Sequence, residues 1–361
     1  MFWPIDADGG ITNLAIFLTW VFLVFYHHYR ASAIGPGFVP LKWKPRNPKD
    51  CDKLQFCLTC QGYKAPRSHH CRKCNRCVMK MDHHCPWINV CCGHMNHASF
   101  TYFLFFAPVG CIHAFYILAM SLYYGFNIRW YIQFGDGTEP RVIFSLYTLI
   151  GSMFAIGLAF GIIISVGILL IVQTKAIWRN RTGIEDWIEQ KSTYRDRDDD
   201  FVYPYDLGVR RNISQVLFTS NGWPKSNGFY WDVKEGCTQF DLTIEQKLQK
   251  ADKKARSLEY VGIKNYSGSF FPITHGPCVC CCFPWSDEPR VPIAPGDRIS
   301  VTRWRKRWLY GDKIFSQSKM VFHQCVVGDN SVPRERGWFP KHCVASVAEN
   351  NGSGDGKCKK N

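Results

Sequence analysis

The segment KMDHHCPWINVCC, residues 80–92, holds two adjacent histidines, an aspartate and three cysteines. Such side chains either bind a metal ion or, when a thiol lies beside a histidine and a carboxylate, form a nucleophile. Spacing separates the two uses, because the pattern C-x2-C-x9-H-x6-C occurs twice, the second copy starting fourteen residues after the first. The two sets are Cys57, Cys60, His70 and Cys77, and Cys71, Cys74, His84 and Cys91.

Each set offers three thiolates and one imidazole, which complete the tetrahedral shell of a structural zinc ion. A closed shell of this kind supplies folding energy to a segment too short to bury a core. The alternatives are a disulfide framework or ordinary buried cysteines, but C-x2-C pairs with histidines at a repeated spacing favour zinc. The sequence therefore predicts two structural zinc ions.

Cys85 belongs to neither set, because a third copy that began there would need a cysteine where Ile88 stands. One alternative is a buried thiol without chemistry. If His84 binds zinc, however, His83 is left beside Asp82 and close to the thiol. A histidine can take the thiol proton, and a carboxylate can fix the orientation of that histidine. We therefore predict Cys85, His83 and Asp82 as catalytic residues.

At this point the residues resemble a known family. The cysteine spacing from Cys57, the DHHC run at 82–85, the following PWINVC and the pair Asn96-x3-Phe100 are similar to the cysteine-rich domain of DHHC protein S-acyltransferases. The resemblance implies that Cys85 accepts a fatty acyl group from acyl-CoA and passes it to a substrate cysteine. It also implies that His83 is the base, that Asp82 orients it, and that His84 binds zinc.

Acyl-CoA requires a membrane for its tail and water for its head. Three apolar stretches fit a membrane: residues 11–26, which reach spanning length if 27–29 lie at the interface, 98–128 and 142–172. Buried helices of a soluble protein are the alternative. For the CoA phosphates we expect contacts from Lys64, Arg67 and His69. For the fatty chain the expected lining residues are Trp87, Phe100 and Phe103, with anchoring in the aromatic belt of the membrane as the alternative.

Charge predicts the orientation of these spans. Acidic residues precede the first span, whereas lysines and arginines follow the first and third spans, which marks those sides as cytosolic. The basic residues are Arg30, Lys42, Lys44, Arg46 and Lys49, then Lys175, Arg179 and Arg181, and the acidic ones are Asp6 and Asp8. Reduced cytosolic thiols agree with eighteen cysteines. The net charge of +15 indicates attraction to the membrane surface and to CoA; without a basic recognition helix, nucleic acid is not expected as a partner.

Three spans leave the N-terminus in the lumen, whereas most members of the family have four spans and two cytosolic ends. We therefore expect that a first helix is missing from this sequence. Other landmarks of the family resemble segments here: GPG at 35–37, TGIE at 182–185 and YPYDLGVRRNISQVLF at 203–218, with Asn212 as a polar anchor. The resemblance implies that these segments pack beneath the zinc domain.

The C-terminal part reads as a basic helix at 243–258 followed by a small β domain. The stretches APGDRISV, RWLYGDK and RGWFPKHCV resemble a Src-homology-three-type barrel, in which Trp308 and Trp338 would be core or groove residues. The aromatic motif of its first strand is eroded to VGIKNYSG, so proline-peptide binding is left open, and a regulatory protein is a possible partner. The four cysteines of the segment CVCCC, residues 278–282, suggest a site of acylation, with a further metal site as the weaker alternative.

The expected fold is a polytopic α-helical membrane protein with a small zinc-stapled cytosolic domain and a C-terminal small β-barrel. The boundaries are 1–30 for the first span with a luminal lead, 31–97 for the zinc domain, 98–128 and 142–174 for the later spans around a luminal loop at 129–141, 175–257 for the cytosolic tail, 258–348 for the barrel and 349–361 for a basic tail.

The expected function is protein S-palmitoyl transfer from palmitoyl-CoA through acyl-Cys85. Lys357 and Lys359 fit a K-x-K-x-x retrieval signal, which favours the endoplasmic reticulum membrane and client proteins there. The C-terminal module resembles that of the family member that acts on calnexin, which suggests calnexin-like clients. Two alternatives are a zinc-organised scaffold without chemistry and a thiol redox sensor that pairs Cys85 with Cys92. The run of Asp82, His83 and Cys85 favours the enzyme.

Overall fold

The computed structural model describes residues 5, 9–195, 200–218, 223–286, 288–314 and 335–347. It divides the chain into two compact units, Met1–Lys247 and Leu248–Asn361. The division falls inside helix α7 (Asp241–Ala255), which runs from the first unit into the second. It lies before the predicted boundary at 257. Asp6, Asp8 and the predicted retrieval signal at Lys357 and Lys359 lie outside the described residues.

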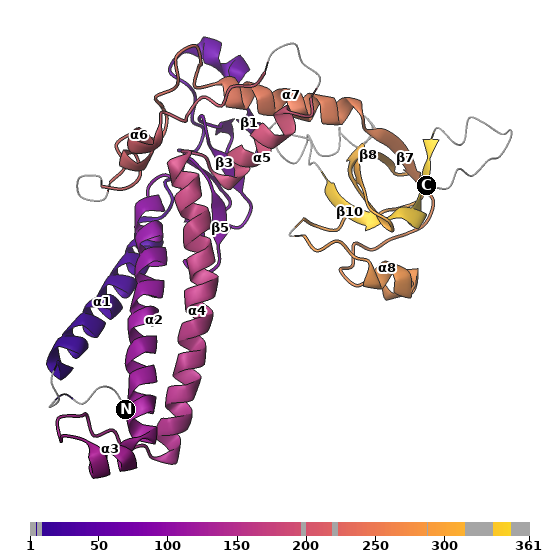
Figure 1. The fold of residues 1–361 in the computed structure, drawn as a ribbon. Helices are drawn as coiled ribbons and strands as arrows, with labels where there is room; N and C mark the ends of the chain where they lie inside the picture. The colour runs from indigo at the N-terminus through magenta and orange to yellow at the C-terminus, as the bar shows by residue number, and fades with distance from the viewer. Residues whose placement is uncertain are drawn as a thin grey trace. The chain divides into compact units, whose positions relative to one another are not determined.

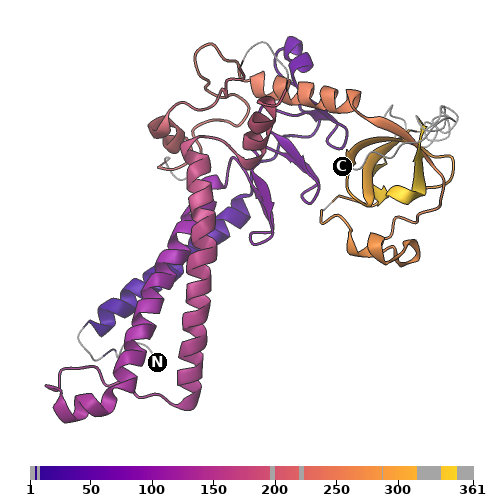
Figure 2. The ribbon, with the colours of Figure 1, turned by 45° about the vertical axis from the view of Figure 1, so that its right-hand side comes forward.

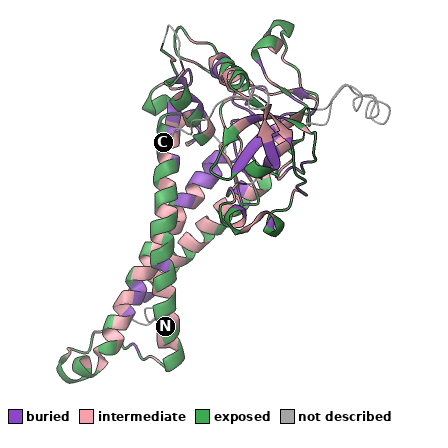
Figure 3. Cartoon of the chain, turned by 90° about the vertical axis from the view of Figure 1, so that its right-hand side faces the viewer, coloured by how far each residue is buried: buried purple, intermediate pink, exposed green. Residues whose placement is uncertain are grey.

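Three helices of the first unit are long and apolar enough to cross a membrane, which confirms the three predicted spans. They are α1 (Gly10–Ile34), α2 (His97–Phe126) and α4 (Leu146–Trp178), and α2 packs against both of the others (Figures 1 and 2). Most of their surface is exposed or half-buried (Figure 3), although the side chains are apolar. Lipid is the environment that such a surface requires.

The ends of these helices differ from the predicted spans because local backbone chemistry, rather than charge, ends them. The helix α1 continues past Arg30 to Ile34 and ends at Gly35, whose φ of 70° lies in the left-handed region. The helix α4 begins after Ser145, whose hydroxyl accepts a hydrogen bond from the backbone N–H of Thr148. A short helix, α3 (Ile128–Phe134), occupies part of the predicted loop between the second and third spans.

The cysteine-rich segment folds into a 3-10 turn, η1 (Pro48–Lys53), and three short hairpins at one end of the helices (Figure 1). The hairpins pair β1 (Phe56–Cys57) with β2 (Gly62–Tyr63), β3 (His69–Cys71) with β4 (Arg76–Val78), and β5 (His83–Cys85) with β6 (Val90–Cys92). Their small buried clusters consist largely of the cysteines themselves. Strands this short need another source of stability, which agrees with the predicted metal sites.

The segment after α4 folds back onto this domain. It contains α5 (Gly183–Ser192), α6 (Val209–Ser214) and the first part of α7. A buried cluster joins α5, the start of α7 and the connecting segments between them: Ile188, Tyr203, Tyr205, Trp231 and Leu242. The predicted anchor Asn212 is fully buried, and its amide donates a hydrogen bond of 2.7 Å to the carbonyl of Trp178, the last residue of α4.

The second unit contains a five-stranded antiparallel sheet in the order β10-β9-β8-β7-β11. The strands are β7 (Leu258–Gly262), β8 (Arg298–Trp304), β9 (Trp308–Ile314), β10 (Arg336–Pro340) and β11 (Val344–Ser346). Two short helical segments precede β8, η3 (Ile273–His275) and α8 (Pro277–Cys281). Trp308 and Trp338 are buried in the core of this unit, as predicted.

The two edge strands of this sheet, β10 and β11, are joined by only three residues, η4 (Lys341–Cys343). Opposite edges that are so close along the chain require the sheet to curve strongly. Pairing between these edges, which would close a barrel, is not among the pairings of the described residues.

Candidate active site and metal centres

Both predicted ligand sets come together in the zinc domain. Within each set the ligand atoms all lie within 4.8 Å of one another. The sulfur of Cys57 lies 3.5 Å from Nδ1 of His70, and the sulfur of Cys74 lies 3.4 Å from Nδ1 of His84. Tetrahedral zinc with its usual bond lengths places neighbouring sulfur and nitrogen ligands about 3.5 Å apart. Donor types and spacing therefore both fit zinc.

Strand alternation explains how two interleaved sets form separate centres. In the β3–β4 hairpin His70 lies opposite Cys77, and both belong to the first set. In the β5–β6 hairpin His84 lies opposite Cys91, and both belong to the second set. Successive side chains of a strand point to opposite faces, so Cys71, next to His70, faces the second centre instead.

The same alternation separates the two adjacent histidines. In β5 His84 faces its zinc centre, whereas His83 and Cys85 share the other face. The residues opposite them in β6 are Cys92 and Val90. The hairpin therefore presents metal ligands on one side and the histidine and thiol of the predicted catalytic group on the other.

Asp82 holds His83 from one end. Its Oδ2 accepts a hydrogen bond of 2.8 Å from Nδ1 of His83. Two donors, one near the end of α4 and one at the start of α5, fix the carboxylate in turn. The backbone N–H of Gly183 donates to Oδ1 at 2.7 Å, and Nε2 of Gln173 donates to Oδ2 at 2.9 Å. With the aspartate so oriented, the second ring nitrogen of His83 is left for chemistry.

The electrostatics of this group favour an ion pair. Burial opposes the charged imidazolium, but the interactions with Asp82 and Cys85 outweigh it and raise the pKa of His83 to about 9. Burial likewise opposes the thiolate, yet His83 and the backbone N–H groups of Ile88 and Trp87 lower the pKa of Cys85 below its ordinary value. Both pKa shifts therefore favour the pair in which the Cys85 proton resides on His83, before any substrate binds.

Cys85 lies in an apolar cluster where the zinc domain meets the helices. Its buried neighbours come from α1, α2 and the β5–β6 hairpin: Ala31, Ile88, Cys92, Phe100 and Leu104. Val166 and Leu170 of α4 pack against the same cluster. The thiol is thus beside the cytosolic-side helix ends predicted from the charge pattern, in surroundings that suit a fatty chain.

The three aromatic residues predicted to line the acyl path occupy different places. Phe100 is buried, and its ring lies 5.6 Å from that of His83. Phe103 packs against the Cys85 cluster. Trp87 is 80% exposed, although its backbone carbonyl lies 3.1 Å from Nε2 of His28 in α1. The structure therefore brings two of the three to the thiol and leaves the indole of Trp87 at the surface.

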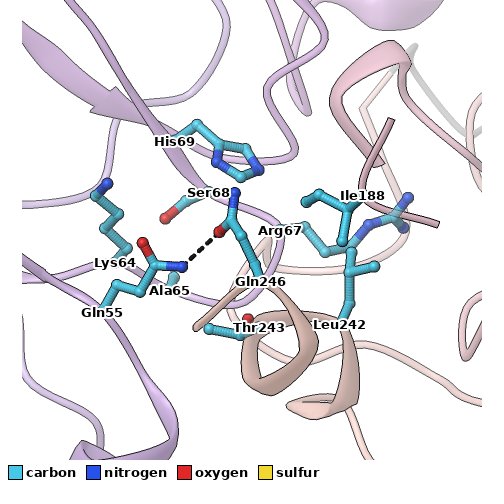
Figure 4. A pocket seen from close by; sticks show the side chains of 10 residues that line it. All are labelled: Gln55, Lys64, Ala65, Arg67, Ser68, His69, Ile188, Leu242, Thr243 and Gln246. Carbon is cyan, nitrogen blue, oxygen red and sulfur yellow. Dashed lines mark hydrogen bonds between the residues drawn. The ribbon is translucent and has the colours of Figure 1, made fainter. Parts of the chain in front are cut away.

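The three residues predicted to contact CoA line one small pocket (Figure 4). Lys64 and His69 line it together with Ser68 and Gln246. Arg67 differs, because its side chain is fully buried and binds both carboxylate oxygens of Glu185, at 2.6 and 2.7 Å. This ion pair argues against a direct contact of the Arg67 guanidinium with CoA. Lys64 and His69 remain the predicted CoA contacts.

Arg67 and Glu185 form a buried ion pair that joins the zinc domain to α5. The hydroxyl of Tyr203 donates to Glu185 at 2.8 Å, and Arg67 also donates to the carbonyl of Asn180 at 2.7 Å. Glu185 completes a capping box with Thr182 at the start of α5. The TGIE segment therefore has two tasks: its glutamate holds Arg67, and the N–H of Gly183 holds Asp82.

Sequence reasoning missed the role of Gln173. Besides binding Asp82, its Oε1 accepts a hydrogen bond of 3.0 Å from Nε2 of His97, at the start of α2. Gln173 thus links the third span, the second span and the predicted catalytic aspartate. A signal was available, since an amide at the end of a long apolar run marks a polar function at a membrane boundary. The pairing of Arg67 with Glu185, 118 residues apart, had no such signal.

Comparison with known proteins gives consistent matches. The model of the family described as DHHC palmitoyltransferase matches residues 50–190. Palmitoyltransferase ZDHHC6 of Homo sapiens is 46% identical over 360 residues, which cover 95% of this chain and 84% of the relative. Palmitoyltransferase ZDHHC6 of Danio rerio is 44% identical over 359 residues, with the same shares covered. Probable protein S-acyltransferase 16 of Arabidopsis thaliana is 30% identical over 224 residues, 59% of this chain and 75% of the relative.

Proposed function

Because the chain belongs to the DHHC palmitoyltransferase family, we propose that Cys85 is the residue that carries the acyl group during protein S-palmitoylation. The observation that supports this assignment most is the two-sided β5–β6 hairpin. It commits His84 and Cys91 to a metal set and leaves Cys85 beside His83, whose other neighbour is Asp82. The lowered pKa of the thiol supports the same assignment.

The proposed reaction has two thioester exchanges. In the first, the Cys85 thiolate attacks the carbonyl carbon of acyl-CoA, a carbon–sulfur bond forms, and the CoA thiolate leaves with the proton of the His83 imidazolium. In the second, His83 takes the proton of a substrate cysteine, whose thiolate attacks acyl-Cys85 and releases the Cys85 thiolate. Asp82 keeps His83 oriented in both steps. Atoms and charge balance in each exchange.

The two ligand sets are proposed to hold structural zinc. Each set is a closed group of three cysteines and one histidine, so no position is left for a substrate. Their contribution is to fix the hairpins that carry Cys85, His83 and Lys64. The chemistry itself is assigned to the protein side chains.

Acyl-CoA is proposed as the donor, with its two ends in different surroundings. Phe100, Phe103 and the cluster around Cys85 would take the fatty chain, where each buried methylene contributes about 0.8 kcal/mol. Lys64 and His69 would face the CoA phosphates from the pocket of Figure 4. The formal charge of +15 would attract the same anion to this side of the membrane.

The cellular setting is part of the proposal. The lysine and arginine pattern supports a cytosolic zinc domain and tail, and the K-x-K-x-x ending supports the endoplasmic reticulum. Clients would be membrane proteins with cytosolic cysteines, of the calnexin type. The curved sheet of the second unit is proposed to be a barrel of the Src-homology-three type that binds a regulatory protein.

The assignment of Cys85 is tested with purified full-length protein and a fatty acyl-CoA. Label on each cysteine is mapped by peptide mass spectrometry before and after hydroxylamine, and transfer to a substrate protein is followed in parallel. Cys85→Ser should abolish transfer and the thioester at position 85, while Cys92→Ala, a change at its buried neighbour, should keep both. Site mapping is needed because the four cysteines of the segment CVCCC, residues 278–282, would be further acceptors of acyl groups.

Full transfer by Cys85→Ser would contradict the assignment. Loss of function in Cys92→Ala together with an oxidised Cys85–Cys92 pair in the wild type would favour the redox sensor instead. A scaffold without chemistry would show neither acylation nor dependence on either cysteine.

A further inference from the structure

Three ligand-type side chains converge in the second unit, away from the two zinc sets of the first. His275 ends η3, and His342 and Cys343 lie in η4, which joins the two edge strands of the sheet. Nδ1 of His275 lies 2.9 Å from Nε2 of His342. The sulfur of Cys343 lies 3.6 Å from the first nitrogen and 3.8 Å from the second.

These separations match those of the zinc sets. In the first unit, sulfur-to-nitrogen distances between ligands run from 3.4 Å for Cys74 and His84 to 3.9 Å for Cys77 and His70. The distances from Cys343 to the two histidines fall within this range. All three atoms also satisfy the same limit of 4.8 Å. The arrangement therefore has the size of a metal shell with three protein ligands.

A hydrogen bond between the two imidazoles would account for their separation without a metal. It would not account for the thiol, because Cys343 is fully buried in the apolar core and still directs its sulfur at both nitrogens. Two ring nitrogens on one tetrahedral zinc lie about 3.3 Å apart, so a small outward movement of the surface imidazole of His342 would admit the ion.

The ion would also meet a structural need of this unit. The segment 271–285, which contains η3 and α8, lies beside the sheet (Figure 1) and exposes Phe271, Ile273 and Trp285. A hydrogen bond of 3.1 Å from Nε1 of Trp308 to the carbonyl of Val279 attaches it to the core. A metal bound by His275 and η4 would join this segment to the chain 67 residues further on, at the connection between the two edge strands.

We propose that His275, His342 and Cys343 form a third zinc site with three protein ligands. Two imidazoles and one thiolate are a borderline donor set that suits zinc, and the fourth position would be taken by water or by an added ligand. The site would fix α8, with its exposed Cys278 and Cys281, against the sheet. It is independent of the chemistry assigned to Cys85.

The test is the zinc content of the full-length protein, measured after exchange against a weak chelator that strips loosely held ions. Wild type should hold three zinc ions per chain, one for each of the three ligand groups. His275→Gln and His342→Gln should each hold one ion fewer. The matched control is Thr274→Ala, an exposed neighbour of His275 without a ligand atom, which should equal wild type. Both histidines lie outside the buried core, so their replacement should leave the sheet folded.

Cobalt supplies a second measurement. After replacement of zinc by Co²⁺, the wild-type spectrum should contain a contribution from a tetrahedral site with one sulfur ligand, and His342→Gln should remove only that contribution. Acylation of Cys85 should be unchanged in the histidine variants, so failure of this proposal is distinct from failure of the catalytic assignment.

Three outcomes would overturn the site. Two zinc ions in the wild type would mean hydrogen-bonded side chains without a metal. A third ion that the chelator removes would be an adventitious ion only. A third ion that survives both histidine changes but is lost when Cys280, Cys281 and Cys282 become serine would belong to the cysteine cluster instead.

Discussion

At the scale of single residues, the adjacent histidines of the DHHC run have unlike environments because they face opposite sides of β5. His84 lies among cysteines, at 3.4 Å from the sulfur of Cys74, whereas His83 binds Asp82. A histidine that holds a metal and a histidine that moves a proton should respond differently to the same substitution.

We predict that His84→Ala loses one zinc ion relative to wild type and lowers the melting temperature, since a ligand set is then incomplete. His83→Ala should keep the full zinc content and slow acyl loading by about a hundredfold or more, the usual effect of losing a proton-transfer group. Metal analysis and single-turnover acylation check the two parts. Equal zinc loss from both variants would refute the division of roles.

A second prediction concerns Lys80, which is buried in the zinc domain. Burial and the charge of Arg67 lower the pKa of Lys80 to about 7. Glu185, Asp82 and Cys92 raise its pKa and offset part of this effect. Because the folded-state pKa is below the ordinary value of 10.5, the unfolded state binds more protons between these pH values, and stability should rise with pH across that window.

Lys80→Met removes the titrating group while keeping much of its volume. We expect the variant to melt above wild type near pH 7, with an advantage that shrinks as the pH rises towards 9. Melting temperatures of the two proteins across this range provide the measurement. An advantage that is constant with pH would show that the charge of Lys80 has no part in it.

At the scale of elements, the segment from α4 to α5 binds the zinc domain through polar contacts at two points. One is the buried pair of Arg67 and Glu185, and the other is the double support of Asp82 by Gln173 and Gly183. The first contact acts on stability, and the second acts on the geometry of the active site. Separate substitutions should therefore give separate defects.

For the first contact we predict that Arg67→Ala lowers the free energy of unfolding by about 3–5 kcal/mol, because an unpaired carboxylate is left buried. Lys64→Glu, a change in the same pocket, should leave stability near wild type and raise the KM for acyl-CoA, more so at low salt. Thermal unfolding and steady-state kinetics distinguish them. A normal melting temperature for Arg67→Ala would contradict the structural role.

For the second contact we predict that Gln173→Leu slows acyl loading by about tenfold or more, since a hydrogen bond to a charged group contributes about 1.5–3 kcal/mol. Gly183→Thr should remain active, because its backbone donor is kept and an added Cβ would lie 3.6 Å from Oδ1 of Asp82, an ordinary contact. Single-turnover acylation is the measurement. Slower loading by Gly183→Thr than by Gln173→Leu would reverse the assignment.

The sequence sufficed for features that depend on short-range spacing. Both ligand sets and the three membrane helices follow from intervals and run lengths within one segment. The partner of Arg67 did not follow, because Glu185 is brought to it only by the fold, and a basic residue beside a zinc site suggested CoA instead. Gln173 did leave a local signal, an amide at the end of an apolar run, but its target, Asp82, lies 91 residues away.

At the scale of the whole molecule, the charge pattern predicts which side of the membrane each loop occupies. Tyr194, after α5, is 90% exposed, and Thr138, between α3 and α4, is also exposed. With the plasma membrane selectively permeabilised, a membrane-impermeant maleimide should modify the cysteine introduced by Tyr194→Cys but not that introduced by Thr138→Cys. Full permeabilisation should expose both. The opposite pattern would invert the proposed orientation.

The alternation of β5 also has a consequence for how such proteins diverge. Since the zinc face and the thiol face are set by even and odd positions, a single substitution at Cys85 would remove the proposed chemistry, and one at His83 would slow it, without touching a ligand. A folded, inactive descendant is therefore one mutational step away. A one-residue deletion within the strand, in contrast, would exchange the faces and lose both properties at once. The strand pattern would thus let a descendant lose the proposed chemistry in one substitution, but it would not let the chemistry move along the chain.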